Sequence, residues 1–327
     1  MLDLTDARQS VDEEAPMLIY SHPVCWKHEN ENDVMLPHPE RPERLDAVMA
    51  AIERFPAKRH TRVEAPLGDK GDYELAHDPR YVEAIFSQAP TDFQALRVDG
   101  DTSLNQYTIE ASRRVVGAAK AAIDAVLPGP ERRAFLATRP PGHHAGPCQP
   151  RGFCVFNNVS IAAYYAIRHH GLERVAIVDF DVHHGDGTEE IVANSDAVRF
   201  FSIFQHPYYP YSGIPPIADN CFPIGLPNMT DGEAFREGVR DSVWFETLRE
   251  FRPQLLLFSA GFDAHKNDPL GGWILEDEDF AWITREVIAA AGGDDLPVVS
   301  LLEGGYDLEG LEDSVLAHLK ALDGDAG

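Results

Sequence analysis

Short, unbroken runs of hydrophobic residues alternate with longer amphipathic segments from residue 17 onwards. The short runs are rich in β-branched and aromatic residues, which is typical of strands buried on both faces of a parallel sheet. They predict strands at 17–21, 135–138, 174–181, 198–204, 254–261 and 296–305. Apolar positions at helical spacing predict helices at 43–55, 112–127, 157–170, 231–251 and 276–292.

This alternation of strand and helix, without an internal repeat or a Ser/Gly-rich linker, predicts one doubly wound α/β domain with a mainly parallel central sheet. The Pro/Gly-rich segments 138–152 and 206–227 are predicted to be loops. In such sheets, the loops at the carboxyl ends of the strands form the functional site. Residues 1–16 are acidic and aperiodic and predict a flexible arm, so the folded domain is expected to span 17–327.

The composition limits the kinds of molecule that the protein is expected to bind. The chain has 327 residues, of which 44% are hydrophobic and 25% charged, as in ordinary globular proteins. Its 28 Lys and Arg against 54 Asp and Glu give a net charge of −26. Such a charge argues against direct binding of nucleic acid or of an anionic membrane, because both repel an acidic surface. It suits a cationic partner such as a polyamine or a Lys-rich peptide, and it equally suits simple solubility.

Targeting signals are not apparent in the sequence. The first twenty residues lack a basic start followed by an apolar run, and no stretch approaches the length of a membrane span. The four cysteines include no CxxC pair, so neither a disulfide framework nor a thiolate zinc site is indicated. We therefore expect a cytoplasmic protein.

Two predicted strands end in residues that bind metals. The run 174–181 leads into Asp181 and His183, which lie two apart and point to the same side of an extended chain. The run 254–261 leads to Asp263, and parallel strands bring their carboxyl ends together. Asp, His and Asp with an open fourth position are typical of a catalytic zinc site. The alternatives are a solvated polar turn and, for Asp263, a helix N-cap.

Further candidates for proton transfer lie near these ligands in the predicted topology. His143 and His144 follow another strand, and Asp179 and Asp186 could orient the two imidazoles. The histidines could equally be metal ligands or surface residues. Tyr306 follows the last strand and could donate a hydrogen bond to a developing oxyanion, or simply pack.

Six motifs in the same order resemble one known family. They are HPERPERL (38–45), RPPGHHA (139–145), GFCVFNNVSIAA (152–163), VDFDVHHGDGTEE (178–190), SAGFDAHKNDPLGG (259–272) and EGGYDLEGL (303–311). Together they resemble the arginase/deacetylase superfamily and, more narrowly, zinc-dependent histone deacetylases of class II type with their bacterial relatives, including acetylpolyamine amidohydrolases. The resemblance spans about 17–320 and implies the single-domain arginase/deacetylase fold.

The resemblance implies roles for individual residues. One zinc ion per chain would be held by Asp181, His183 and Asp263. His144, paired with Asp186, would be the general base, and His143, paired with Asp179, an electrostatic or general-acid partner. Tyr306 would bind the carbonyl oxygen. A structural potassium ion would be bound by a neighbouring set, namely Asp179, Asp181, His183 and Ser202.

The resemblance also implies the substrate tunnel. Gly152 and Phe153 would line one wall, and Tyr209 would stand on the opposite wall, where the family usually has Phe; Tyr211 stands where Gly is typical. Asp101 would hold the substrate at the rim, and Arg44 would lie by an internal acetate-release channel. Leu270 occupies the position where polyamine-selective members carry a glutamate, which favours acetyl-lysine.

The implied activity is zinc-dependent hydrolysis of N-acetylated amines, most directly acetyl-lysine side chains of proteins or peptides, with release of acetate. Other short acyl groups, acetylpolyamine substrates, and Fe²⁺ in place of Zn²⁺ remain open. The sequence also leaves open two other functions, namely a non-catalytic module that binds acylated amines and a binuclear arginase-type hydrolase. A homo-oligomeric state is open as well.

Overall fold

One parallel sheet organises the part of the chain that the structure, a computed structural model, describes: residues 16–31 and 37–324. The predicted arm at 1–16 lies outside the described residues except for Pro16. Every neighbouring pair of strands in this sheet is parallel. In spatial order the strands are β2 (His60–Glu64), β1 (Met17–Ser21), β5 (Arg133–Leu136), β10 (Val298–Leu302), β9 (Leu255–Ala260), β6 (Val175–Asp179), β7 (Val198–Gln205) and β8 (Cys221–Leu226).

The central strands bury side chains on both faces. In β9, Leu256 and Phe258 belong to one hydrophobic cluster, whereas Leu255 and Leu257 belong to another. Because side chains alternate along a strand, the two clusters lie on opposite faces of the sheet. This double burial explains why the strands are continuous hydrophobic runs.

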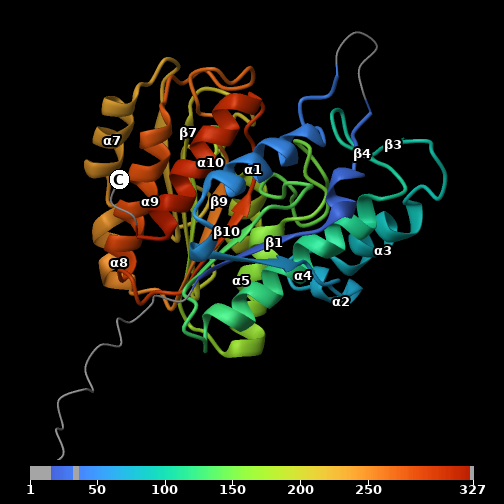
Figure 1. Cartoon of the computed structure of the whole chain (residues 1–327), viewed down its shortest axis with the longest axis horizontal. Helices are drawn as coiled ribbons and strands as arrows, with labels where there is room; N and C mark the ends of the chain where they lie inside the picture. Colours follow the sequence, from blue (N-terminus) through green and yellow to red (C-terminus); the bar gives the residue numbers. More distant parts are fainter. Residues whose placement is uncertain (1–15, 32–36, 325–327) are drawn as a thin grey trace, which may run out of the picture.

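Helices cover both faces (Figure 1). The first cluster is completed by α1 (Glu43–Arg54), α7 (Gly232–Arg240), α8 (Trp244–Phe251), α9 (Asp277–Ala291) and α10 (Leu308–Leu322). The second is completed by α4 (Thr108–Val126), α5 (Asn158–His170) and the short α6 (Asp186–Val192). Among the described helices, none has the length and apolar character needed to cross a bilayer.

A smaller layer lies beside α4 and α5, where α2 and α3 are drawn in Figure 1. It has its own aromatic cluster, which includes Tyr73, Tyr81 and Phe156. Its elements are α2 (Lys70–Tyr73), α3 (Pro79–Gln88) and the two-stranded pair of β3 (Leu96–Arg97) and β4 (Ser103–Leu104). Two short 3-10 helices, η1 (Pro23–Trp26) and η2 (Ala57–Arg59), follow β1 and α1 respectively.

The α/β prediction is confirmed, and two of its details are wrong. The segment 206–227 is not all loop, because β8 pairs with β7 at the edge of the sheet. An edge strand tolerates Pro223, since one of its sides needs no backbone partner. The helix predicted at 231–251 is two helices: Ser242 donates to the Val239 carbonyl at 2.7 Å and accepts from Trp244 N at 3.2 Å, so its hydroxyl competes with the helical ladder.

Several other elements were not predicted, and for two of them the sequence signal is weak or local. The edge strand β2 has mostly exposed or half-buried residues and therefore no continuous apolar run. α6 is only seven residues long and begins inside the Asp/His motif. α10 has a regular apolar face that periodicity alone could have found.

His318 of α10 is a buried histidine whose surroundings keep it neutral. Its Nδ1 lies 2.7 Å from Thr284 Oγ1, and its Nε2 lies 2.8 Å from Ser300 Oγ. Thr284 Oγ1 donates its own proton to the Phe280 carbonyl, so it accepts from Nδ1–H, and Ser300 donates to Nε2. Burial lowers the pKa of His318 to about 3.

We expect His318 to make stability depend on pH. The unfolded chain takes up a proton below about pH 6.5, whereas the folded chain does not until about pH 3, so this stability is present above pH 6.5 and is lost as pH falls. In urea unfolding, the advantage of wild type over His318→Gln should shrink by about 2 kcal/mol between pH 7.5 and pH 5. An unchanged difference would show that His318 does not titrate in this way.

Candidate active site

The residues predicted to carry out the chemistry lie at the carboxyl ends of four neighbouring strands, β5, β10, β9 and β6. β6 ends at Asp179, and Asp181 and His183 follow it. Asp263 follows β9, which pairs with β6. β5 leads into the histidine loop, and β10 leads into the turn that carries Tyr306. Because the strands are parallel, these segments meet at one edge of the sheet.

Asp181, His183 and Asp263 form a compact group of metal-ligand type. Their donor atoms all lie within 4.8 Å of one another. His183 Nδ1 is 3.0 Å from Asp181 Oδ1 and 3.0 Å from Asp263 Oδ2. Although burial opposes protonation, hydrogen bonds to these carboxylates raise the pKa of His183 to about 10. The two buried carboxylates are therefore stable only with a positive charge between them. A divalent cation bound at this point would supply that charge.

Gly304 allows these carboxylates to converge. A Cβ on this residue would lie 2.4 Å from Asp263 Oδ2 and 2.6 Å from Asp181 Oδ2, closer than a side chain can approach. Its backbone N–H donates to Asp181 Oδ2 at 2.9 Å. The second position of the EGG turn is therefore glycine because the ligand carboxylates occupy the space of a side chain.

The two loop histidines are each held by a different aspartate. His143 Nδ1 lies 2.9 Å from Asp179 Oδ2, and His144 Nδ1 lies 2.7 Å from Asp186 Oδ1. The two ring centroids are 4.0 Å apart. Arg151 contacts the other oxygen of Asp186 at 3.2 Å and donates to the His144 carbonyl at 2.7 Å. Both pairings proposed from the sequence are thus present in the structure.

The two rings have opposite proton affinities. Burial and the neighbouring charge of His143 lower the pKa of His144 to about 4. For His143, burial also opposes protonation, but the carboxylates of Asp179 and Asp181 hold its pKa well above its usual value. Near neutral pH, one ring is thus a proton acceptor and its neighbour a proton donor.

Glu303 supports the histidine loop, a role that the sequence did not indicate. Its Oε2 accepts from Gly142 N at 2.7 Å and from His143 N at 3.2 Å, and Ser259 Oγ donates to Oε1 at 3.3 Å. Donor atoms of Glu303, His143 and Cys154 also lie within 4.8 Å of one another. Since both carboxylate oxygens already accept hydrogen bonds, we assign Glu303 to holding the loop against β9.

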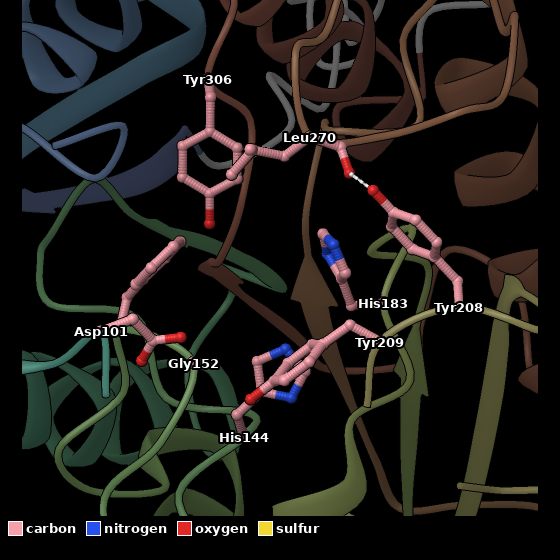
Figure 2. A pocket seen from close by; sticks show the side chains of 9 residues that line it. Asp101, His144, Gly152, His183, Tyr208, Tyr209, Leu270 and Tyr306 are labelled. Atoms are coloured by element: carbon pink, nitrogen blue, oxygen red, sulfur yellow. Dashed lines mark hydrogen bonds between the residues drawn. The ribbon is translucent and has the colours of Figure 1, made fainter. Parts of the chain in front are cut away.

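A pocket of about 150 Å³ opens onto this group. Figure 2 shows the Tyr306 hydroxyl pointing into it, opposite His144 and His183. Burial raises the pKa of Tyr306 well above its usual value, so the phenol remains a hydrogen-bond donor. The structure places all five predicted substrate-binding residues in the lining, which comprises Asp101, His144, Gly152, Phe153, His183, Tyr208, Tyr209, Leu270 and Tyr306.

Aromatic rings form the walls of the pocket. Phe153 meets Tyr306 edge-on with centroids 5.8 Å apart, and Tyr209 meets His144 edge-on at 5.2 Å. Gly152 has φ +55°, and a Cβ there would lie 2.5 Å from the His144 ring, so only glycine fits. Tyr208 was not predicted, although it is adjacent to Tyr209 in the same Pro-rich loop; its ring stacks on His183 at 5.6 Å.

The remaining predicted residues lie around the pocket. Asp101 is at the exposed rim, where Thr102 Oγ1 donates to its Oδ1 at 3.0 Å. Arg44 is fully buried behind the pocket, with its guanidinium 4.9 Å from the Tyr306 ring centroid. It donates to the Gly305 carbonyl at 2.6 Å and to the Glu303 carbonyl. Ser202 pairs with Asp179 across β7 and β6, and its Oγ lies 3.0 Å from His184 Nδ1.

Comparisons with known proteins agree with this geometry. The family model described as histone deacetylase domain matches residues 38–322. A histone deacetylase-like amidohydrolase of Pseudomonas aeruginosa is 35% identical over 82% of this chain and 71% of its own length. The human polyamine deacetylase HDAC10 is 34% identical over 88% of this chain, which spans only 45% of that protein.

A solved structure has the same fold. The crystal structure of the HDA15 HD domain superimposes with a TM-score of 0.87 at 29% sequence identity, covering 95% of this chain and 91% of that one. The similarity therefore extends over nearly the whole described domain.

Proposed function

Because this chain belongs to the histone deacetylase family, we propose that it hydrolyses the acetyl amide of acetyl-lysine side chains in proteins or peptides and releases acetate. Other short acyl groups on lysine fall within the same proposal. We further propose that Zn²⁺ is the catalytic ion, at one per chain, and that the catalytic domain spans 17–327.

One observation carries the proposal. A metal-ligand group, two carboxylate-paired histidines with opposite proton affinities and a phenol donor all border a single pocket. Hydrolysis of an amide needs a polarised carbonyl, an activated water, a base, an acid for the leaving amine and a donor to the oxyanion. For each of these requirements, a residue that could meet it borders the same pocket.

Asp181, His183 and Asp263 would hold the zinc ion, which, when bound, polarises the acetyl carbonyl and makes a water acidic enough to react near neutral pH. A potassium ion would be held beside it by Asp179, Asp181, His183 and Ser202. Carboxylate and imidazole ligands suit zinc, whereas potassium prefers oxygen ligands such as carboxylate and hydroxyl groups. Asp179 and Ser202 offer such oxygens and are both buried.

The protein's own groups move the protons. His144, oriented by Asp186, accepts a proton from the attacking water. Tyr306 donates its hydroxyl proton in a hydrogen bond to the carbonyl oxygen as that oxygen gains charge. His143, whose charge is stabilised by Asp179, protonates the leaving nitrogen as the C–N bond breaks. Acetate and a free amine result. Arg44, whose guanidinium lies behind the Tyr306 ring and is paired with Glu40 at 3.0 Å, would lie beside the path of the departing acetate.

The pocket walls suit an acyl-lysine chain. Phe153 and Tyr209 present aromatic surfaces on which four methylene groups can pack. Gly152 lets the His144 ring lie directly against the backbone of the pocket wall, and Asp101 at the rim offers a carboxylate that can accept from a peptide N–H. Leu270 completes the mouth with an apolar side chain.

The proposal is tested by comparing acetyl-lysine peptides, acetylspermidine and longer acyl-lysine peptides on one purified sample. We expect the highest kcat/KM for acetyl-lysine, loss of turnover after complete chelation, and recovery with added Zn²⁺. A hydroxamate should inhibit, because a bidentate chelator can fill the open coordination position.

Two outcomes would contradict the proposal. Full turnover by protein shown to contain no metal would refute the metal mechanism. Binding of acetyl-lysine peptide by the zinc-loaded protein without any turnover would instead indicate a non-catalytic module for acylated amines.

Deacetylation of acetylpolyamines is the second candidate. The net charge of −26 and the carboxylate of Asp101 at the rim would both attract a polycation. The similarity to the polyamine deacetylase HDAC10 also supports it. Leu270 argues against it, because an apolar residue at the mouth offers no charge to a secondary ammonium group.

Leu270→Glu should shift selectivity towards polyamines. A carboxylate at the mouth should raise kcat/KM for acetylspermidine about tenfold, because a favourable ion pair of this kind contributes about 1.4 kcal/mol. Leu270→Gln has the same shape without the charge and should not do so. Equal effects of the two variants in steady-state assays would show that shape, and not charge, decides selectivity here.

A further inference from the structure

Asp268 is a buried carboxylate that does not line the pocket but joins two parts of its wall. It is 8% exposed and precedes Leu270 in the segment after β9. Its Oδ2 accepts from Tyr306 N at 2.6 Å and from Asp307 N at 3.2 Å. Its Oδ1 accepts from Leu270 N at 2.9 Å. Both oxygens are therefore engaged, one by the turn that carries Tyr306 and the other by the mouth of the pocket.

Tyr208 extends this connection. Its hydroxyl donates to the Leu270 carbonyl at 3.0 Å, on the same side of the pocket (Figure 2). Leu270 is thus held by its carbonyl from one side and by its N–H from the other. A continuous path of hydrogen bonds leads from Tyr208 through Leu270 and Asp268 to the backbone of Tyr306.

We propose that Asp268 is a positioning residue, which fixes the Tyr306 hydroxyl in its reactive position and couples it to the Leu270 wall of the pocket. The inference rests on the proposed function, since it concerns the residue that donates to the oxyanion. Gly304 and Gly305 permit many backbone conformations, so hydrogen bonds from outside the turn must fix it. Asp181 and Arg44 hold the glycine part of the turn. Asp268 holds the part that carries the phenol, through the adjacent N–H groups of Tyr306 and Asp307.

Asparagine is the informative replacement. It has the shape of aspartate but only one acceptor oxygen, so its NH₂ group must face either the Leu270 N–H or the N–H pair of Tyr306 and Asp307. One side of the connection is then lost while the volume is unchanged. Because a small displacement of a catalytic group is costly, we expect Asp268→Asn to lower kcat about 10- to 100-fold with a smaller change in KM.

A double-mutant cycle with Tyr306→Phe provides the test. If Asp268 acts through the Tyr306 hydroxyl, Asp268→Asn should reduce kcat strongly in the wild-type background and less than about twofold in the Tyr306→Phe background. An equal loss in both backgrounds would overturn the inference, because the effect would then be independent of the hydroxyl. Failure of the wild-type protein to deacetylate any substrate would instead refute the proposed function, which separates the two hypotheses.

Asp279→Asn is the matched control. Asp279 is also buried and uses both oxygens, accepting from Glu276 N at 2.9 Å and from Arg236 Nε at 2.8 Å, but it does not line the pocket. Its replacement should lower thermal stability and leave kcat unchanged. If Asp268→Asn does not fold, Tyr208→Phe removes the far end of the same path; its kcat loss should likewise disappear in the Tyr306→Phe background, and persistence there would overturn the inference.

Discussion

Asp263→Ala is expected to abolish metal binding and with it deacetylation. The substitution removes one of three protein ligands and leaves Asp181 and His183 as the only donors of the group. After dialysis, zinc content should fall from about one equivalent to near zero. Turnover should fall by more than about 100-fold, because loss of a residue that only orients a metal ligand already costs up to about that factor. Elemental analysis and steady-state assays measure the two effects.

An exposed aspartate provides the control for this substitution. Asp231 caps the start of α7, where its side chain accepts from Ala234 N at 2.9 Å, and it lies outside the pocket lining. Asp231→Ala should lower the free energy of unfolding by about 1 kcal/mol and leave zinc content intact. Tight stoichiometric zinc in the Asp263→Ala variant would show that the ligand set is wrong.

Tyr306→Phe should lower kcat on acetylated substrates about 10²–10³-fold. The change deletes only the hydroxyl that points into the pocket, and the ring can still pack against Phe153 and the Arg44 guanidinium. Zinc content and melting temperature should therefore stay close to wild type. A trifluoroacetyl substrate should lose less, since its electron-poor carbonyl needs less help from a donor.

Tyr165→Phe is the corresponding control. It deletes a hydroxyl that donates to Asp124 Oδ1 at 2.9 Å and that lies outside the pocket lining, so kcat should not change. Near-normal turnover of acetyl-lysine by Tyr306→Phe would remove Tyr306 from the mechanism. Unfolding or loss of zinc in that variant would assign the hydroxyl a structural role instead.

Local sequence was a good guide to the sheet and to the ligands. Central strands must be hydrophobic along their whole length when both faces are covered, so β6 and β9 stand out as continuous runs. Residues at the ends of such strands are brought together by the parallel topology itself, which is why Asp181 and Asp263 could be paired before any distance was known. β8 lies at the edge of the sheet, where a strand need not be a continuous hydrophobic run. The break between α7 and α8 depends on one serine hydroxyl. Hydrophobic periodicity reveals neither feature.

The sequence by itself thus determined the α/β class, most of the central strands and the residue types of the site. Only the tertiary structure decided which of these side chains support the others. Glu303 and Asp268 act across 160 and 38 residues, respectively, on backbone N–H groups that carry no sequence signature. The opposite proton affinities of His143 and His144 likewise arise from burial and from carboxylates on another strand. Distance, desolvation and hydrogen-bond direction are properties of the folded chain, and two adjacent histidines acquire different chemistry only there.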